Sequence, residues 1–297
     1  MASYGRALAD AQGGSLVAVG FNLMDHERLN AFGVDKLYNI DTQGAVHFDV
    51  ERYSEALAQV ATKESASLMV VSSSADGRYI GPIVAVKTDA AYMSNVVGLP
   101  SQYGPLQVKR TCFTNKAFNE TQSTKERVVL SLSSNSYGLH EKQGTAEVLS
   151  GDYPISSNSL KVESVEKVTD KVSIADADIV VSGGRGLKGP ENWHLIEDLA
   201  DVLGAATACS KPVSDMGWRS HSEHVGQTGK PVASNLYIAI GVSGAIQHLA
   251  GINASKVKVV INSDPEAPFF KAADYGIVGD ALEVVPVLTE TLQARLQ

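Results

Sequence analysis

The sequence has few of the features that mark secreted, membrane-spanning or nucleic-acid-binding proteins. It contains two cysteines, Cys112 and Cys209, among 297 residues, which argues against a disulfide scaffold and is typical of a reducing compartment. No apolar run approaches the ~20 residues that span a bilayer, and residues 1–14 lack the basic and apolar regions of a signal peptide. We therefore expect an intracellular protein without membrane insertion.

A basic surplus is also missing. The 25 Lys and Arg residues against 33 Asp and Glu residues give a net charge of −8, which argues against a nucleic-acid partner. We expect no metal site, because His221 and His224 flank a polar loop without the cysteine or carboxylate spacing of metal ligands. The chain also has no nucleophile elbow, no zinc-protease motif and no paired carboxylates of the kind that hydrolases use.

What the chain does have is enough apolar material for ordinary cores, with 44% hydrophobic and 20% charged residues. At ~150 residues per domain its length suggests two domains. Helix and strand patterns alternate in both halves, which is typical of parallel sheets covered by helices. We expect helices at residues 4–11, 28–32, 50–64, 191–203, 244–250 and 287–292. We expect strands at residues 16–19, 36–40, 68–71, 179–181, 237–240 and 257–261.

Between the halves the pattern changes. The segments 106–113, 128–132 and 145–149 are short, β-rich and separated by turn residues, which predicts antiparallel strands at the edge of the first domain. A polar, charge-alternating stretch at 161–171 indicates a linker. We therefore predict an α/β fold of two domains, each a mostly parallel sheet with flanking helices. The first covers residues 1–162, a linker follows at 163–173, and a doubly wound nucleotide-binding domain covers 174–297.

Three strands of the second domain lead directly into loops that suit a phosphate-containing ligand. These loops are Ser-Gly-Gly-Arg-Gly at 182–186, the segment 241–248, and Asn-Ser-Asp-Pro at 262–265. In open α/β sheets, ligands bind outside the carboxyl ends of the strands. Glycines let backbone N–H groups approach a phosphate, and Arg185 adds a planar fork that binds it. The three loops together predict one shared cofactor crevice.

Each of these features also has a plainer interpretation. A Gly-Gly turn after a strand is often only a tight connection, and Ser243 can be simply the N-cap of the next helix. The segment Val-Gly-Gln-Thr-Gly-Lys at 225–230 matches neither the P-loop nor the dinucleotide fingerprint. It is a surface turn, or a loop whose glutamine and threonine hydrogen-bond a polar ring. His248 is a structural histidine or a residue that faces the crevice.

Taken in order, these segments resemble the α subunit of electron transfer flavoprotein. The similarity runs through residues 181–188, 225–230, 236–251, 261–268 and 273–278, and so covers essentially all of 174–297. Residues 1–160 resemble the more variable first domain of that family, without motifs of comparable strength. The resemblance implies one subunit of a heterodimeric electron carrier, with one FAD bound mainly to the second domain and no substrate chemistry of its own.

The resemblance also implies partners. A β subunit packs nearby and usually holds a structural AMP, acyl-CoA or related dehydrogenases of the fatty acid β-oxidation type reduce the FAD, and a membrane-bound quinone oxidoreductase reoxidises it. The expected location is the cytoplasm of a bacterium, or the mitochondrial matrix if the protein is eukaryotic. The alternatives are a stand-alone FAD- or NAD-dependent oxidoreductase, a nucleotide-binding regulatory module, and an electron-bifurcating variant of the carrier.

Carried over position by position, the resemblance implies which residues contact FAD. At the phosphates, ribose or adenosine it places Arg185, Asn262 and Asp280, and it gives Ala281 as a further cofactor-binding residue. Beside the isoalloxazine it places Ser210 and Lys211, and at the ring edge Val225, Gly226, Gln227 and Thr228. From the pyrophosphate to the pyrimidine side it places Ser243, Gly244, Ala245, Ile246, Gln247 and His248. His248 is then a candidate donor to the flavin O2, and flavin tuning is assigned to Lys211, His248 and Thr228.

Two positions depart from the family pattern. The family has an arginine after the serine of the segment 208–210, whereas this chain has Lys211. The family also begins with a strand and a loop before its first helix, whereas here the helix follows Met1 almost at once. We therefore expect the first family strand to be absent from the first domain, with a sheet edge exposed there.

Overall fold

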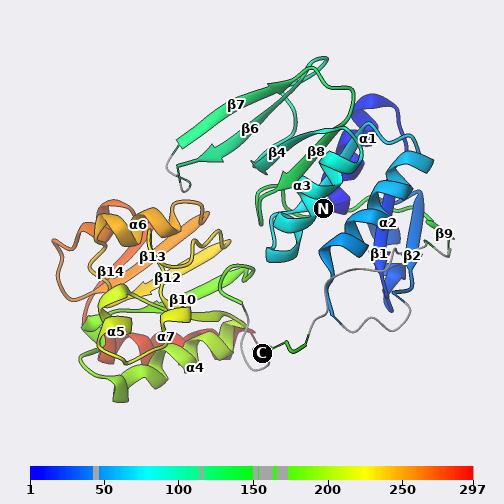
Figure 1. Ribbon diagram of the computed structural model, residues 1–297. Coiled ribbons are helices and arrows are strands. Elements are labelled where there is room, and N and C mark those ends of the chain that lie inside the picture. The colour runs from blue at the N-terminus through cyan, green and yellow to red at the C-terminus, as the bar shows by residue number, and fades with distance from the viewer. Residues whose placement is uncertain are drawn as a thin grey trace. The chain divides into compact units, whose positions relative to one another are not determined.

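The computed structural model describes residues 1–42, 47–113, 115, 117–149, 153, 163–165 and 173–296. Figure 1 shows the two compact units of the chain, Met1–Thr111 with Phe118–Lys167, and Cys112–Ala117 with Val168–Gln297. Both have the predicted α/β architecture with parallel sheets and flanking helices. Most of the predicted linker, residues 166–172, lies outside the described residues. None of the helices in the described ranges is both long and apolar enough to cross a membrane.

The first unit contains two sheets. Its helices are α1 (Ala2–Gln12), the 3-10 helix η1 (His26–Ala31), α2 (Val50–Lys63) and α3 (Ala75–Lys87). Its strands are β1 (Val17–Phe21), β2 (Lys36–Ile40), β3 (Leu68–Ser72), β4 (Ala91–Val96), β5 (Gln102–Tyr103), β6 (Leu106–Cys112), β7 (Ala117–Ser123), β8 (Val128–Leu132) and β9 (Glu147–Leu149). One sheet has the order β1-β2-β9, and the other has the order β3-β8-β4-β6-β5 with β7 paired to β6.

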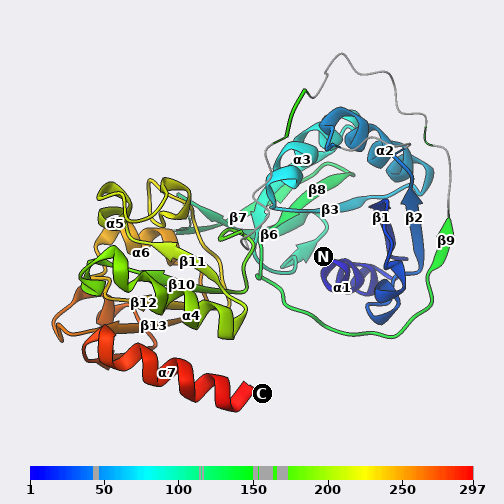
Figure 2. The same ribbon diagram turned by 90° about the horizontal axis from the view of Figure 1, so that it is seen from below.

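Helices cover both faces of the larger sheet, as Figure 2 shows for α1 on one side and α2 and α3 on the other. α1 buries Tyr4 and Leu8 against the apolar residues of β4, β6 and β8. α3 buries Val84 and Ala85 against Val129, which lies on the opposite face of β8. α1 ends at Gly13, whose φ of 63° is the left-handed conformation that stops a helix.

The prediction of antiparallel strands was right for one segment and wrong for two. β6 is antiparallel to β4 and β5, whereas β8 is parallel to both its neighbours, β3 and β4, and β9 is parallel to β2. All five residues of β8 are buried, and a continuous apolar run of this kind is typical of a central parallel strand. The turn residues on either side of β8 are typical of antiparallel strands, and they obscure this apolar run in the sequence.

Two helical segments also differ from expectation. The helix predicted at 28–32 is instead the 3-10 helix η1, which ends at Ala31 and has no buried residue, and therefore no apolar stripe to hold an α-helix. α3 was not predicted, because Gly77, Gly81 and Pro82 weaken its helical pattern. It forms nevertheless, since Ser74 caps it by accepting from the Gly77 N–H at 3.3 Å.

The second unit is built on one parallel sheet with the strand order β11-β10-β12-β13-β14. Its strands are β10 (Ile179–Gly183), β11 (Ala206–Cys209), β12 (Leu236–Ile240), β13 (Val257–Asn262) and β14 (Tyr275–Val278). Its α-helices are α4 (His194–Leu203), α5 (Lys211–Asp215), α6 (Ile246–Ile252) and α7 (Ala281–Leu296). Its 3-10 helices are η2 (Arg185–Leu187), η3 (Pro190–Trp193), η4 (His221–Glu223) and η5 (Pro268–Lys271).

Apolar cores lie on both faces of this sheet. Figure 1 shows α4 and α7 on one face of the sheet and α6 on the other. The first face buries Val181, Ile238 and Ile261, and the other buries Tyr237 and Phe269. From β10 the chain goes first to β11 on one side and then to β12 on the other. The loops after β10 and β12 therefore diverge at a topological switch point, which is where open α/β sheets bind their ligands.

Candidate functional site

The loops after β10 and β12 touch each other through their backbones. The Gly184 N–H donates to the Ile240 carbonyl at 2.8 Å, and the Gly186 N–H donates to the Gly241 carbonyl at 3.0 Å. A Cβ on Gly184 would lie 2.2 Å from the Gly241 carbonyl oxygen, and a Cβ on Gly186 would lie 2.5 Å from the Gly241 Cα. Gly241 itself has a φ of 64°. The glycines therefore permit this close approach of the two loop backbones at the switch point.

The loop after β13 joins the same edge. The Asn262 side-chain amide donates to the Val242 carbonyl at 3.0 Å, so the side chain ties β13 to the loop after β12. The Ser243 carbonyl accepts from the Phe269 N–H at 3.1 Å. Gly244 has a φ of 83°, and a Cβ there would lie 2.5 Å from the Phe269 nitrogen. The three loops that the sequence analysis singled out thus meet at one edge of the sheet.

The segment 225–230 packs against the start of α6. The Gln227 N–H donates to the Gln247 carbonyl at 2.7 Å, and a Cβ on Gly251 would lie 2.6 Å from the Gly226 Cα. Val225 is fully buried, whereas Gln227 and Thr228 are exposed. The segment is anchored by its backbone and presents its two polar side chains to the outside.

The residues after β11 approach this edge from the other side of β10. The Ser210 N–H donates to the Gly183 carbonyl at 3.0 Å, and the Ser210 side chain is buried. Lys211 begins α5 and is exposed. Burial, followed by the positive charge of Lys211, lowers the pKa of His224. Lys211 therefore contributes positive potential close to the segment 225–230.

Asp280 lies at the start of α7 and has two partners. Its Oδ1 accepts from the Leu282 N–H at 3.0 Å, and its Oδ2 lies 2.6 Å from the Lys188 Nζ. The hydrogen bond from Lys188 is the main cause of its lowered pKa. Ala281 is buried beside it. Arg185 opens η2 after β10 and is exposed.

His248 is almost completely buried, with 6% of its surface exposed. Its Nε2 lies 2.9 Å from the Tyr237 hydroxyl, and burial, assisted by His224, lowers its pKa to about 4. Ser243, Ala245, Ile246 and Gln247 are exposed ahead of it. α6 begins at Ile246 with Ala245 as its N-cap. The helix starts two residues later than predicted, and the interpretation of Ser243 as its N-cap was wrong.

Sequence reasoning missed Lys188 and Tyr237 as partners of predicted site residues. Lys188 lies within a segment that carries the family resemblance, but nothing local indicates that it pairs with Asp280. Tyr237 carries a signal that could have been used, because it is the one polar-tipped side chain in the strand Leu-Tyr-Ile-Ala-Ile. A buried phenol hydroxyl usually has a hydrogen-bond partner.

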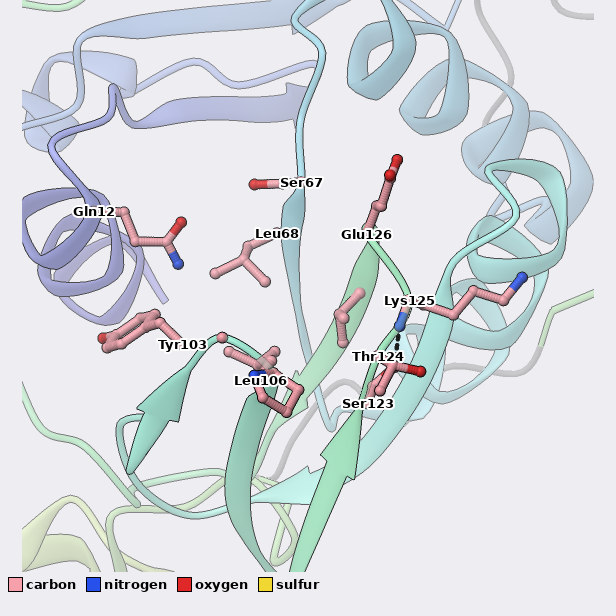
Figure 3. Close-up of a pocket in the computed structure, with 12 residues that line it drawn as sticks. Gln12, Ser67, Leu68, Tyr103, Leu106, Ser123, Thr124, Lys125 and Glu126 are labelled. Atoms are coloured by element: carbon pink, nitrogen blue, oxygen red, sulfur yellow. Dashed lines mark hydrogen bonds between the residues drawn. The ribbon is translucent and has the colours of Figure 1, made fainter.

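One cleft among the described residues belongs to the first unit. It has a volume of about 300 Å³ and is lined by Gln12, Leu68, Tyr103, Leu106 and Lys125, among others. Figure 3 shows these side chains around the amino end of β3. Ligands of open α/β sheets bind at carboxyl ends, and the cleft contains none of the predicted site residues.

Comparisons with known proteins decide the family. Residues 1–152 match the family model described as the electron transfer flavoprotein domain. Residues 173–253 match the model described as the electron transfer flavoprotein FAD-binding domain. The chain belongs to the electron transfer flavoprotein α-subunit family.

Curated relatives agree with this assignment. The electron transfer flavoprotein subunit alpha of Bacillus subtilis (strain 168) is 35% identical over 278 residues, which cover 92% of this chain and 86% of that protein. The protein of the same name from Thermoanaerobacterium thermosaccharolyticum is 34% identical over 298 residues, 97% of this chain and 90% of the relative. A probable mitochondrial α subunit of Caenorhabditis elegans is 40% identical over 227 residues, 75% of this chain and 67% of the relative.

The FAD that this family binds fits the residues at the carboxyl edge. Arg185 and Lys211 are exposed cations, which suits a pyrophosphate and an electron-rich ring. A Cβ on Gly184 or Gly186 would fill the loop contact at the switch point. The Nδ1 of His248 is buried without a hydrogen-bond partner in the described part of the chain. No group of three or more metal-ligating side chains occurs among the described residues.

Proposed function

We propose that this chain is the α subunit of a heterodimeric electron carrier. Its FAD accepts electrons from dehydrogenases of the acyl-CoA type and passes them to a membrane quinone oxidoreductase. A β subunit with a structural AMP completes the carrier. The proposed setting is the bacterial cytoplasm, or the mitochondrial matrix of a eukaryote.

One observation carries the proposal. Glycine loops, exposed cations and polar side chains converge at the carboxyl edge of the sheet in the second unit. The loop after β12 is hydrogen-bonded there to the loop after β10 and to Asn262 at the end of β13. When bound, FAD supplies the one- and two-electron chemistry. What this chain contributes is binding, orientation and electrostatics.

The residues divide this work by their position and charge. Arg185 is exposed after β10 and is proposed to hold the pyrophosphate, for which its planar guanidinium is suited. Gln227 and Thr228 are exposed on the anchored segment 225–230 and are proposed to hydrogen-bond the ring edge. Lys211 adds positive potential at the isoalloxazine, and His248 is the proposed donor at its pyrimidine side.

A stand-alone FAD- or NAD-dependent oxidoreductase is the weaker alternative. Such an enzyme needs a general acid or base that can reach a substrate. At this edge the Asp280 carboxylate is paired with Lys188 and caps α7 through the Leu282 N–H. The His248 imidazole is buried against Tyr237. These titratable groups hold structure rather than face a substrate pocket.

The test is FAD retention by the purified heterodimer. Arg185→Ala is compared with Arg295→Ala, which removes an exposed arginine from the last turn of α7. Losing a charge-assisted contact of about 1.5–3 kcal/mol weakens FAD binding roughly 10- to 150-fold, measured by fluorescence titration. The Arg295 variant should bind FAD like the wild type. A correctly paired wild-type heterodimer that neither retains nor takes up FAD contradicts the proposal.

A further inference from the structure

Three aromatic rings, from β12, α6 and η5, form a buried cluster next to the proposed flavin site. The Tyr237 hydroxyl on β12 lies 2.9 Å from the His248 Nε2 on α6. Phe269 stacks on Tyr237 with an interplanar angle of 7° at 6.5 Å, and its ring centre lies 6.1 Å from that of His248. All three side chains are buried, so the His248 ring is held in one orientation by contacts from β12 and η5.

The protonation of this pair follows from its burial. Burial raises the pKa of Tyr237 and lowers the pKa of His248 to about 4, so at neutral pH the phenol keeps its proton and the imidazole is uncharged. A neutral imidazole has one N–H donor and one acceptor nitrogen. Which nitrogen carries the proton is set by the hydrogen bond that the other makes.

The chemistry of the two groups favours one arrangement. A phenol is a better donor than acceptor, and an unprotonated imidazole nitrogen is a good acceptor. A hydrogen bond donated by the Tyr237 O–H to Nε2 places the imidazole proton on Nδ1. Within the described residues this Nδ1 is buried and has no hydrogen-bond partner. A buried donor without an acceptor is costly, by about 1–3 kcal/mol, and a ligand that brings an acceptor relieves that cost.

We propose that Tyr237 is a positioning residue that holds His248 as its Nδ1–H tautomer, so that Nδ1–H is the donor for the pyrimidine carbonyl of FAD. The cofactor part of this inference rests on the proposed function. The tautomer part concerns only the chain's own residues. Tyr237 then acts through His248 and itself contacts no cofactor.

The first experiment reads the tautomer directly in the FAD-free heterodimer of this chain with its β subunit. The protein is labelled with ¹⁵N-histidine, and the His248 signals are assigned by their loss in His248→Gln. At pH 7 the wild type should show a single Nδ1–H tautomer. Tyr237→Phe should release Nε2 and give a mixture of both tautomers. Tyr275→Phe removes a hydroxyl from a tyrosine that is 68% exposed on β14 of the same sheet, and should leave the spectrum unchanged.

The wild-type spectrum decides the tautomer even if Tyr237→Phe does not fold. An Nε2–H tautomer in the wild type overturns the inference. So does a folded Tyr237→Phe protein, checked by circular dichroism, in which His248 keeps the wild-type tautomer.

The second experiment adds FAD to the same labelled heterodimer. The His248 Nδ1–H resonances should shift on binding, and in the loaded heterodimer Tyr237→Phe should lower the FAD midpoint potential while Tyr275→Phe does not. If FAD binds and the Nδ1–H resonances stay unchanged, the donor role is overturned while the proposed function stands. If FAD does not bind at all, the proposed function fails, and the tautomer in the FAD-free heterodimer still decides the role of Tyr237.

Discussion

Lys188 and Asp280 lie 92 positions apart in the sequence and are joined by an ion pair of 2.6 Å between Nζ and Oδ2. Lys188 has a left-handed backbone, with a φ of 68°, at the end of the loop that follows β10. Asp280 uses its other carboxylate oxygen to cap α7. The pair therefore connects the loop that carries Arg185 to the start of the last helix.

Replacing Asp280 should separate its capping role from its charge. Asp280→Asn keeps an oxygen that can accept from the Leu282 N–H and loses only an ion pair at the surface, so its melting temperature should fall by no more than about 1–2 °C. Asp280→Ala also loses the cap of α7, so its melting temperature should fall by roughly 3–5 °C. Thermal unfolding followed by circular dichroism measures both. Equal melting temperatures for the two variants would mean that the cap contributes nothing.

Gly184→Ala should separate the loops after β10 and β12. The new Cβ would lie 2.2 Å from the Gly241 carbonyl oxygen, and overpacking of this kind typically destabilises by about 1–3 kcal/mol. Urea unfolding and FAD retention by the heterodimer should both report the change. Gly98→Ala is the matched control, because a Cβ there meets no atom within 4 Å. A Gly184→Ala protein with wild-type stability and FAD content would show that the loops can move apart freely.

Lys211 is exposed at the start of α5 and is proposed to lie beside the isoalloxazine. Its charge should stabilise the electron-rich reduced flavin, although solvent screening limits an exposed charge to about 0.2–1 kcal/mol. For a two-electron couple this is roughly 5–20 mV. Lys211→Ala should therefore lower the FAD midpoint potential, and Lys211→Arg should raise it slightly, because a guanidinium can also stack and hydrogen-bond. Anaerobic reductive titration measures both. Unchanged potentials in both variants would remove Lys211 from the site.

Acid should destabilise the second unit partly through His248. Its pKa of about 4 in the folded protein lies below the value of about 6.5 in an unfolded chain. Between these values the unfolded state binds more protons, so stability falls as the pH drops through this window. For His248 alone the loss between pH 7 and pH 5 is about 2 kcal/mol. Urea unfolding at both pH values should show a correspondingly smaller loss in His248→Gln. An identical loss of stability in both proteins would mean that His248 has the same pKa in the folded and unfolded states.

The first unit should depend on its partner for solubility. Among the described strands, β1 pairs only with β2 and β3 only with β8, so each leaves one edge unpaired. Unpaired edges favour association with other strands. Expressed alone, the chain should elute as oligomers or aggregate, and co-expression with the β subunit should raise its melting temperature. Size-exclusion chromatography and thermal unfolding test this. A monomer whose melt is unaffected by the β subunit would contradict it.

The sequence by itself determined much of the secondary structure. β2 was predicted at its observed bounds, and α2 and β12 within a residue of theirs. α4 ends at Leu203, the last residue of the helix predicted at 191–203, and Gly204 after it has a left-handed φ of 60°. These elements could be read because their signals are local. An apolar run marks a buried strand, a stripe at helical spacing marks a helix, and a glycine with positive φ ends it.

Only the tertiary structure decided how these elements use one another. The central, parallel position of β8 depends on neighbours that lie 60 and 37 positions away, because Met69 of β3 pairs with Val129 and Tyr92 of β4 pairs with the same residue.

 The Ser131 hydroxyl of β8 reaches back 59 positions to the Ser72 carbonyl of β3 at 3.5 Å, and Val128 is in register with Ala91 of β4. The pairs Tyr237–His248 and Lys188–Asp280 likewise join different elements. The order of the strands brings both pairs together, and for Tyr237 and His248 burial also removes water as an alternative hydrogen-bond partner. No local pattern of residues encodes that choice, because it exists only after the strands have assembled.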